Sequence, residues 1–260
     1  MPFSIKPTSL VYLSFMLFCV PLTSQAISIS AFRIYLDNDK PTTSFTIHNP
    51  NVEKQDCRLK LTHYNFDENS ELIKLPEGEI PENSASNWIR FSPQEFTLTA
   101  THSQTIRFTQ RKKANAEPAE YRSYLVIDCE AVSSDQDKQN LISINPKLMH
   151  NVPIIVRNGN LEASIHVANI KAEDGVLSFS VERRGSRSIY ADVELVLKST
   201  DEVVSSQTGF SIYTESERFL FNLSTKDHDP KDLKIRVTEN IYYGGNLVYE
   251  TDVLPENSSL

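Results

Sequence analysis

The chain has 260 residues, and its 34 acidic side chains outnumber its 26 lysines and arginines, which gives a formal net charge of −8. This balance argues against nucleic-acid binding, which needs many cationic side chains gathered against phosphate. The length is enough for two domains of ordinary size, each able to bury its own core.

The first 26 residues have the layout of a secretory signal peptide. Lys6 gives a positive start, residues 10–22 are apolar, and the small residues Ser24 and Ala26 suit peptidase cleavage. Cleavage after Ala26 leaves 234 residues with a charge of 25 minus 34, or −9. The alternative is a membrane anchor, but an apolar helix of this length covers only about two thirds of a ~30 Å hydrocarbon core. No later segment is apolar enough to span a membrane.

The rest of the sequence alternates between apolar and polar residues with a period of two, in short runs rich in Ile, Val, Phe, Tyr and Thr. This pattern predicts an all-β protein with little helix. The predicted strands of the first half are 27–36, 43–49, 56–65, 87–91, 95–99, 104–109, 121–129 and 141–157. Those of the second half are 161–169, 177–183, 189–198, 203–212, 217–223, 232–240 and 246–253.

A turn signal at Arg157-Asn158-Gly159-Asn160 directly follows the apolar run Ile154-Ile155-Val156. It predicts a domain boundary, with a signal peptide at 1–26, a first domain at 27–158 and a second at 159–260. About seven strands on each side are typical of two immunoglobulin-like β-sandwiches in tandem.

The sequence contains no recognisable catalytic motif, and its six histidines do not stand at ligand spacings. Asp227-His228-Asp229-Pro230 is the one local cluster that suggests a metal, and a polar turn closed by proline is the better interpretation. We therefore predict no enzyme activity, no catalytic residue, no metal and no cofactor. A pair of acids assembled in space for hydrolysis stays open as an alternative.

Three cysteines are present, and Cys19 belongs to the signal peptide. Cys57 and Cys129 remain in a chain bound for an oxidising compartment, so one disulfide is expected. Two free buried thiols are the alternative.

Five passages of the first half form an ordered set. They are AFRIY (31–35), FTIHNP (45–50), FSPQEFTL (91–98) followed by QTIRF (104–108), YRSYLV (121–126) and VPIIVR (152–157). In order and spacing, over roughly residues 27–158, the set resembles the amino-terminal domain of the PapD-like periplasmic chaperones of pilus and fimbrial assembly. The second half is similar to that family in length and strand count alone.

The resemblance implies two immunoglobulin-like domains in a boomerang arrangement and a periplasmic chaperone that stabilises pilus or fimbrial subunits by donor-strand complementation. The subunits would then be delivered to an outer-membrane usher. The donor segment would be residues 141–148, with Ile142, Ile144 and Leu148 on one face. On that fold Cys57 and Cys129 fall on neighbouring antiparallel strands, where a disulfide can join them.

The resemblance also assigns roles to individual cations. Arg33 matches the arginine that anchors the subunit's terminal carboxylate, whereas Pro153 occupies the position of the partner lysine and offers neither charge nor N–H. Arg122 stands where the family carries a glutamate that pairs with the arginine matched by Arg157. That interdomain ion pair is therefore not expected in its usual form.

Within this resemblance, the departures indicate a divergent, non-classical member, or a relative that keeps the fold and has a different client. The alternative is a secreted structural or adhesive protein of two immunoglobulin-like domains that donates no strand. The sequence does not name the client subunit, and it leaves open whether the free protein caps itself as a dimer.

Overall fold

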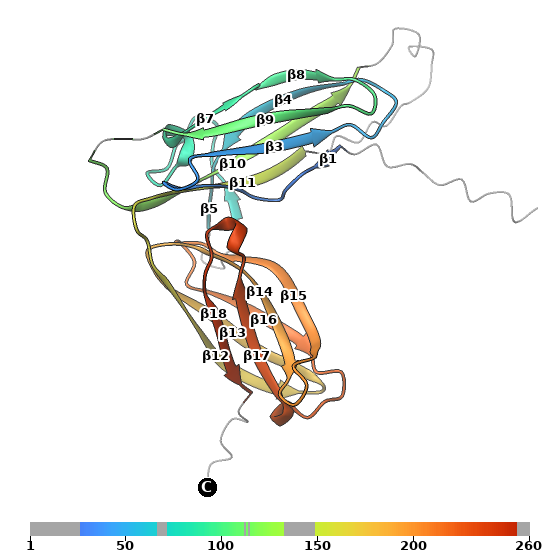
Figure 1. Cartoon of the computed structure of the whole chain (residues 1–260), viewed down its shortest axis with the longest axis vertical. Helices are drawn as coiled ribbons and strands as arrows, with labels where there is room; N and C mark the ends of the chain where they lie inside the picture. The colour runs from blue at the N-terminus through green and yellow to red at the C-terminus, as the bar shows by residue number, and fades with distance from the viewer. Residues whose placement is uncertain (1–26, 67–71, 112, 114, 133–148, 254–260) are drawn as a thin grey trace, which may run out of the picture.

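The computed structural model describes residues 27–66, 72–111, 113, 115–132 and 149–253, and Figure 1 shows two β-rich lobes joined at an angle. The all-β prediction is confirmed. The only helical segments among the described residues are three short 3₁₀ turns, namely η2 (Ala85–Trp88), η4 (Pro230–Asp232) and η5 (Ile241–Tyr243). Within these ranges, no helix is long and apolar enough to cross a membrane.

The first domain packs a four-stranded sheet against a five-stranded sheet, with a small hairpin beside them. The four-stranded sheet has the order β1 (Ser28–Ile29), β3 (Thr42–His48), β9 (Ser103–Gln110) and β7 (Ile89–Ser92). The five-stranded sheet has the order β2 (Ile34–Leu36), β11 (Met149–Asn158), β10 (Ala119–Ala131), β4 (Gln55–Thr62) and β8 (Glu95–Leu98). The hairpin joins β5 (Tyr64–Phe66) and β6 (Leu72–Lys74).

The predicted strand 27–36 is in fact two strands in different sheets. β1 pairs antiparallel with β3, and β2 pairs parallel with β11. The chain crosses between the sheets at the exposed residues Ser30 and Phe32. One segment therefore borders both sheets on the same side of the sandwich, where unpaired strand edges would otherwise be left.

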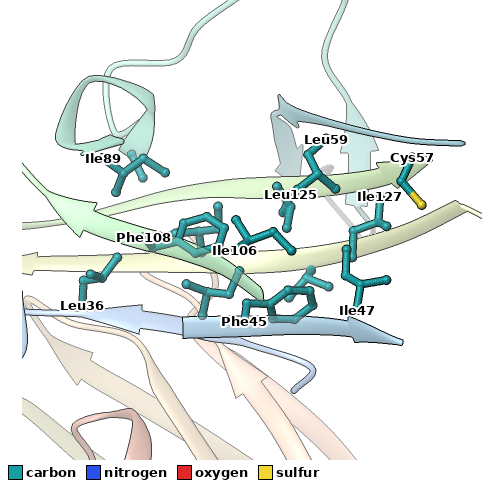
Figure 2. Packing of buried hydrophobic residues seen from close by; sticks show 14 of the residues in the cluster. Leu36, Phe45, Ile47, Cys57, Leu59, Ile89, Ile106, Phe108, Leu125 and Ile127 are labelled. Atoms are coloured by element: carbon teal, nitrogen blue, oxygen red, sulfur yellow. The ribbon is translucent and has the colours of Figure 1, made fainter. Parts of the chain in front are cut away.

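The core of the first domain comes from the alternate positions that the sequence pattern predicts. Phe45, Ile106 and Phe108 are almost completely buried, and Figure 2 shows side chains of both sheets facing one another across the interior. The ring of Phe91 stacks on Phe108 with 5.3 Å between centroids. Full burial of each such side chain contributes roughly 1.5–3 kcal/mol.

The second domain is a separate sandwich with its own core. One sheet has the order β12 (Ala163–Glu173), β13 (Val176–Gly185) and β16 (Arg218–Ser224). The other has the order β15 (Val203–Ile212), β14 (Ile189–Leu197), β17 (Leu233–Glu239) and β18 (Val248–Asp252). The first core ends at Val156 and the second begins at Ile165, on either side of the turn at Gly159.

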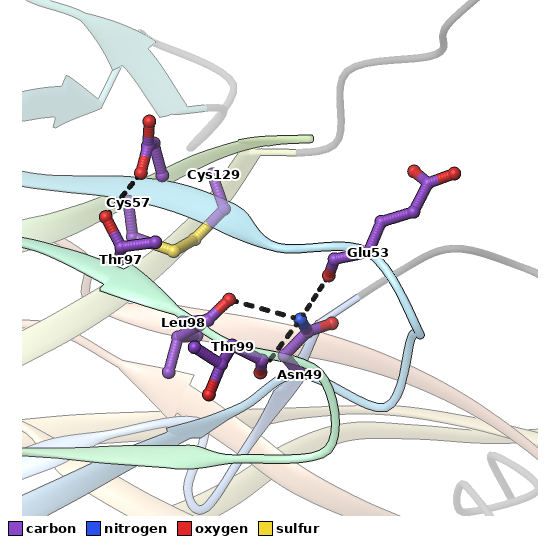
Figure 3. The surroundings of a disulfide bond; sticks show 8 residues. Asn49, Glu53, Cys57, Thr97, Leu98, Thr99 and Cys129 are labelled. Atoms are coloured by element: carbon purple, nitrogen blue, oxygen red, sulfur yellow. Dashed lines mark hydrogen bonds between the residues drawn. A yellow bond between two sulfur atoms is a disulfide. The ribbon is translucent and has the colours of Figure 1, made fainter. Parts of the chain in front are cut away.

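A disulfide joins Cys57 of β4 to Cys129 of β10, as Figure 3 shows. The two residues are directly opposite in the antiparallel register, with 4.1 Å between their Cα atoms. The pairing expected from the family resemblance is therefore found. Nearby, the Asn49 side chain donates hydrogen bonds to the carbonyls of Glu53 at 2.7 Å and Thr99 at 3.3 Å, which fixes the adjoining loops.

Buried His63 makes the stability of the first domain depend on pH. Its Nε2 lies 2.7 Å from the hydroxyl of Ser84, and burial lowers the pKa of His63 below its usual value. As pH falls through about 6.5, His63 therefore takes up a proton in the unfolded chain but not in the folded chain. The free energy of unfolding should therefore fall as pH drops below about 6.5, by at most about 1.4 kcal/mol per pH unit.

Urea unfolding at pH 7.5, 6.5 and 5.5 measures this effect. His63→Gln should lose the dependence in this window, and the exposed His166→Gln should keep it. Equal slopes for wild type and His63→Gln would refute the assignment.

Candidate functional site at the domain junction

The candidate site lies between the domains, on the face of the five-stranded sheet that points away from the first core. Side chains at alternate positions of β10, β11 and β2 share this face, because directly opposed residues lie on the same side of a sheet. They are Glu120, Arg122 and Tyr124 of β10, Arg157, Ile155 and Pro153 of β11, and Tyr35 of β2 with Arg33 two residues before it.

Arg157 and Glu120 form a buried ion pair within the first domain, and both residues also make hydrogen bonds to the second domain. The Nε of Arg157 donates to Glu120 at 2.8 Å, and its other nitrogens donate to the carbonyls of Ser188 at 2.9 Å and Gly244 at 2.8 Å in the second domain. The Ser188 N–H donates back to Glu120 at 3.0 Å. Arg122 does not pair with Arg157, so the ion pair does not take the form that the family resemblance gives it, but Arg157 does have an acidic partner. Its partner is Glu120, two residues before Arg122 and directly opposite Arg157 in the register.

Gly244 allows the second domain to approach the Arg157–Glu120 pair closely. Its φ of +71° lies in the left-handed region, and a Cβ there would collide with the hydroxyl of Tyr35 and crowd Arg157. Burial raises the pKa of Tyr35 well above its ordinary value, so the hydroxyl stays protonated and donates to Asp37 at 2.7 Å.

Arg122 forms a second bridge between the domains. Its two terminal nitrogens donate to the Glu215 carboxylate at 2.9 and 3.1 Å, and its guanidinium lies 4.2 Å from the ring centre of Tyr213. Asn83 also donates to Glu215. Sequence reasoning missed Glu215, since nothing in the pattern of the second domain sets this carboxylate apart from the other loop acids.

Arg33 reaches into the same junction but has no acidic partner. Its Nη2 donates to the hydroxyl of Ser211 at 2.5 Å and lies 3.5 Å from the hydroxyl of Tyr213. The carbon of its guanidinium lies 4.4 Å from the ring centre of Tyr190. Only 4 % of the residue is exposed, and its Nε has no hydrogen-bond partner. Among the described residues, no carboxylate lies within ion-pair distance of Arg33. It is a buried cation held by hydroxyls and rings alone.

The strand beside Arg33 has one open side over part of its length. β11 pairs with β2 only across Ile154–Val156, so in the described part of the chain Met149–Pro153 has a neighbour on the β10 side alone. Met149 at its start is 50 % exposed. The predicted donor residues Ile142, Ile144 and Leu148 lie outside the described residues. The N–H and C=O groups on this side of Met149–Pro153 could pair with an added β-strand from another chain.

No group of three or more His, Cys, Asp or Glu side chains that could hold a metal occurs among the residues with described positions. At the cluster that the sequence singles out, the Asp229 side chain accepts from the N–H of Lys231 at 3.0 Å and caps η4. The cluster is a turn, as predicted.

No protein-family profile matches the chain, and no curated protein sequence matches it. Solved structures do. A chain in the structure of the Salmonella enterica SafA pilin in complex with the SafB chaperone is 12 % identical, with a TM-score of 0.50 over 89 % of this chain and 97 % of that one. The E. coli chaperone DraB is 10 % identical, with a TM-score of 0.48 over 88 % and 97 %.

The Pseudomonas aeruginosa CupB2 chaperone is 11 % identical, with a TM-score of 0.44 over 86 % of this chain and 100 % of that one. At such identities the likeness is one of fold. The chain in the SafA–SafB complex, with its TM-score of 0.50, confirms the two-domain fold that the sequence resemblance implies.

Proposed function

We propose that the chain is a periplasmic chaperone that holds pilus or fimbrial subunits at the edge of β11 and delivers them to an outer-membrane usher. The observation that carries this proposal is the unpaired guanidinium of Arg33, buried beside an open strand edge, when Arg122 and Arg157 each have a carboxylate partner. The fold shared with a chain of the SafA–SafB pilin–chaperone complex supports it.

In this proposal a subunit's terminal carboxylate is the missing counter-ion of Arg33. A guanidinium binds a carboxylate most strongly where water is excluded, because its donors match the two oxygens. Pro153 supplies no second cation, so the hydroxyls of Ser211 and Tyr213, already directed at Arg33, would donate the remaining hydrogen bonds. With only 4 % of Arg33 exposed, one of these side chains has to move for the carboxylate to enter.

The main chain of the subunit would add to the open side of β11 next to this anchor. Backbone hydrogen bonds supply affinity there without reading sequence, and alternate apolar side chains supply contact with the subunit's groove. Ile142, Ile144 and Leu148 are the proposed donors, and full burial of each would contribute roughly 1.5–3 kcal/mol.

Replacing Ile144 with aspartate should abolish subunit capture. A carboxylate placed in an apolar groove costs several kcal/mol, so affinity for a subunit encoded beside the chain's gene should fall at least about 100-fold. Ser143→Asp is the matched control. It introduces the same charge at the neighbouring residue, whose side chain points to the opposite face of the strand and away from the proposed groove contacts. Co-expression and titration of the purified proteins measure both, and equal losses for the two variants would contradict strand donation.

A second candidate is a structural or adhesive surface protein of two sandwich domains. The near-complete burial of Arg33 favours it, since the contacts with Ser211, Tyr213 and Tyr190 already tie the domains together. In that case Ile144→Asp would leave every partner interaction unchanged.

A further inference from the structure

A groove runs along β7 in the first domain, on the opposite margin from the Arg33 junction. It is an open hollow with a volume of about 490 Å³, a size ordinary for a binding site. Leu61, Ile89 and Phe91 form its apolar floor, and the exposed side chains of Arg90, Arg107 and Arg111 stand around it. The groove has no acidic residue in its lining.

The three arginines of this groove are not neutralised within the described part of the chain. None of the three takes part in an ion pair among the described residues. The acid closest to Arg90 in sequence, Glu95, pairs with Arg58 at 2.9 Å. In a chain of net charge −8, three unpaired guanidinium groups around one hollow make a local positive field that attracts anionic groups. Guanidinium groups prefer carboxylates among protein anions, because their geometry is matched.

The backbone beside the groove has an unpaired side as well. β7 is the last strand of the order β1-β3-β9-β7, so among the described strands only β9 pairs with it. Register places Arg90 opposite Thr109 and Ser92 opposite Arg107, so the cations of the two strands share the outer face. An extended chain lying along β7 would thus meet backbone groups, an apolar floor and cations within a few residues.

We infer that this groove binds an extended acidic segment of a partner protein, in which carboxylates alternate with apolar side chains. The carboxylates pair with Arg90, Arg107 and Arg111, and an apolar side chain enters above Leu61 and Phe91. In the strand orders, β7 and β8 lie at the ends opposite β1 and β2, so β11 stays free while the groove is occupied. The inference does not depend on the proposed strand donation.

A fluorescent ten-residue peptide that alternates glutamate with valine is a suitable probe, read by fluorescence anisotropy on the mature chain. The triple variant Arg90→Gln, Arg107→Gln and Arg111→Gln should bind it at least tenfold more weakly than wild type. The triple variant Lys171→Gln, Arg184→Gln and Arg218→Gln removes the same charge from exposed positions of the second domain and should bind as wild type. Higher salt should weaken binding to wild type, because the carboxylate contacts are exposed.

Three results would overturn the inference: no binding to wild type, equal loss in both triple variants, or equal binding of a glutamine–valine peptide. Sedimentation of the wild type decides a further point. Self-association that the groove variant abolishes would make the occupant a second copy of this chain and not a partner's segment. Subunit capture by the groove variant should match wild type, so failure here and failure of the strand-donation proposal are told apart.

Discussion

Replacement of Arg157 with alanine should lower the free energy of unfolding by about 3–5 kcal/mol, because it leaves a buried carboxylate without its counter-ion. The side chains of Arg157 and Glu120 are only 7 % and 3 % exposed. The change also removes the hydrogen bonds to Ser188 and Gly244, so the second domain loses part of its attachment. Denaturant unfolding measures the loss, and small-angle scattering measures the freed domain motion.

A surface ion pair of similar length serves as the control. Arg58 lies 2.9 Å from Glu95, but their side chains are 70 % and 69 % exposed. Arg58→Ala should cost at most about 1 kcal/mol, because water screens such pairs. Equal costs for Arg58→Ala and Arg157→Ala would show that the junction pair does not stabilise the chain.

Removal of the disulfide should lower the free energy of unfolding by an amount similar to that of Arg157→Ala. Cys57 and Cys129 are 72 residues apart in sequence, and closing a loop of that length stabilises by about 4 kcal/mol on the chain-entropy model. The double variant Cys57→Ser and Cys129→Ser should therefore unfold at much lower denaturant concentration than the oxidised wild type.

Reduced wild type is the natural comparison for this variant. It should unfold close to the double serine variant, since the cross-link and not the sulfur atoms carries the effect. An unchanged midpoint on reduction would mean that the bond forms too rarely to matter, or that the unfolded chain is already constrained.

The strands of this fold follow from the sequence because a period of two in side-chain polarity fixes both strand and face. The sequence could not show that residues 27–36 divide between two sheets, because both halves have the same strand-forming composition. The β5–β6 hairpin was also missed, since Leu72–Lys74 is short and exposed.

The site was predictable only where one residue matched one position of the family pattern. The family pattern singles out Arg33, Arg122 and Arg157 in this way, but the surroundings of these residues depend on contacts between distant strands. Glu120 pairs with Arg157 through the β10–β11 register, and Glu215 reaches Arg122 from another domain. The arginines of the β7 groove are dispersed in sequence at 90, 107 and 111, so only folding assembles them.

The carboxylate proposed to pair with Arg33 can be tested directly by a double-mutant cycle. A peptide with the sequence of a subunit's last strand would be titrated into wild type and Arg33→Gln, once with a free and once with an amidated terminus. We expect amidation to weaken binding to wild type by at least about 1.5 kcal/mol more than binding to Arg33→Gln. An equal cost of amidation in both proteins would refute the pairing of Arg33 with the terminal carboxylate, because Arg33 would then not sense the terminal charge.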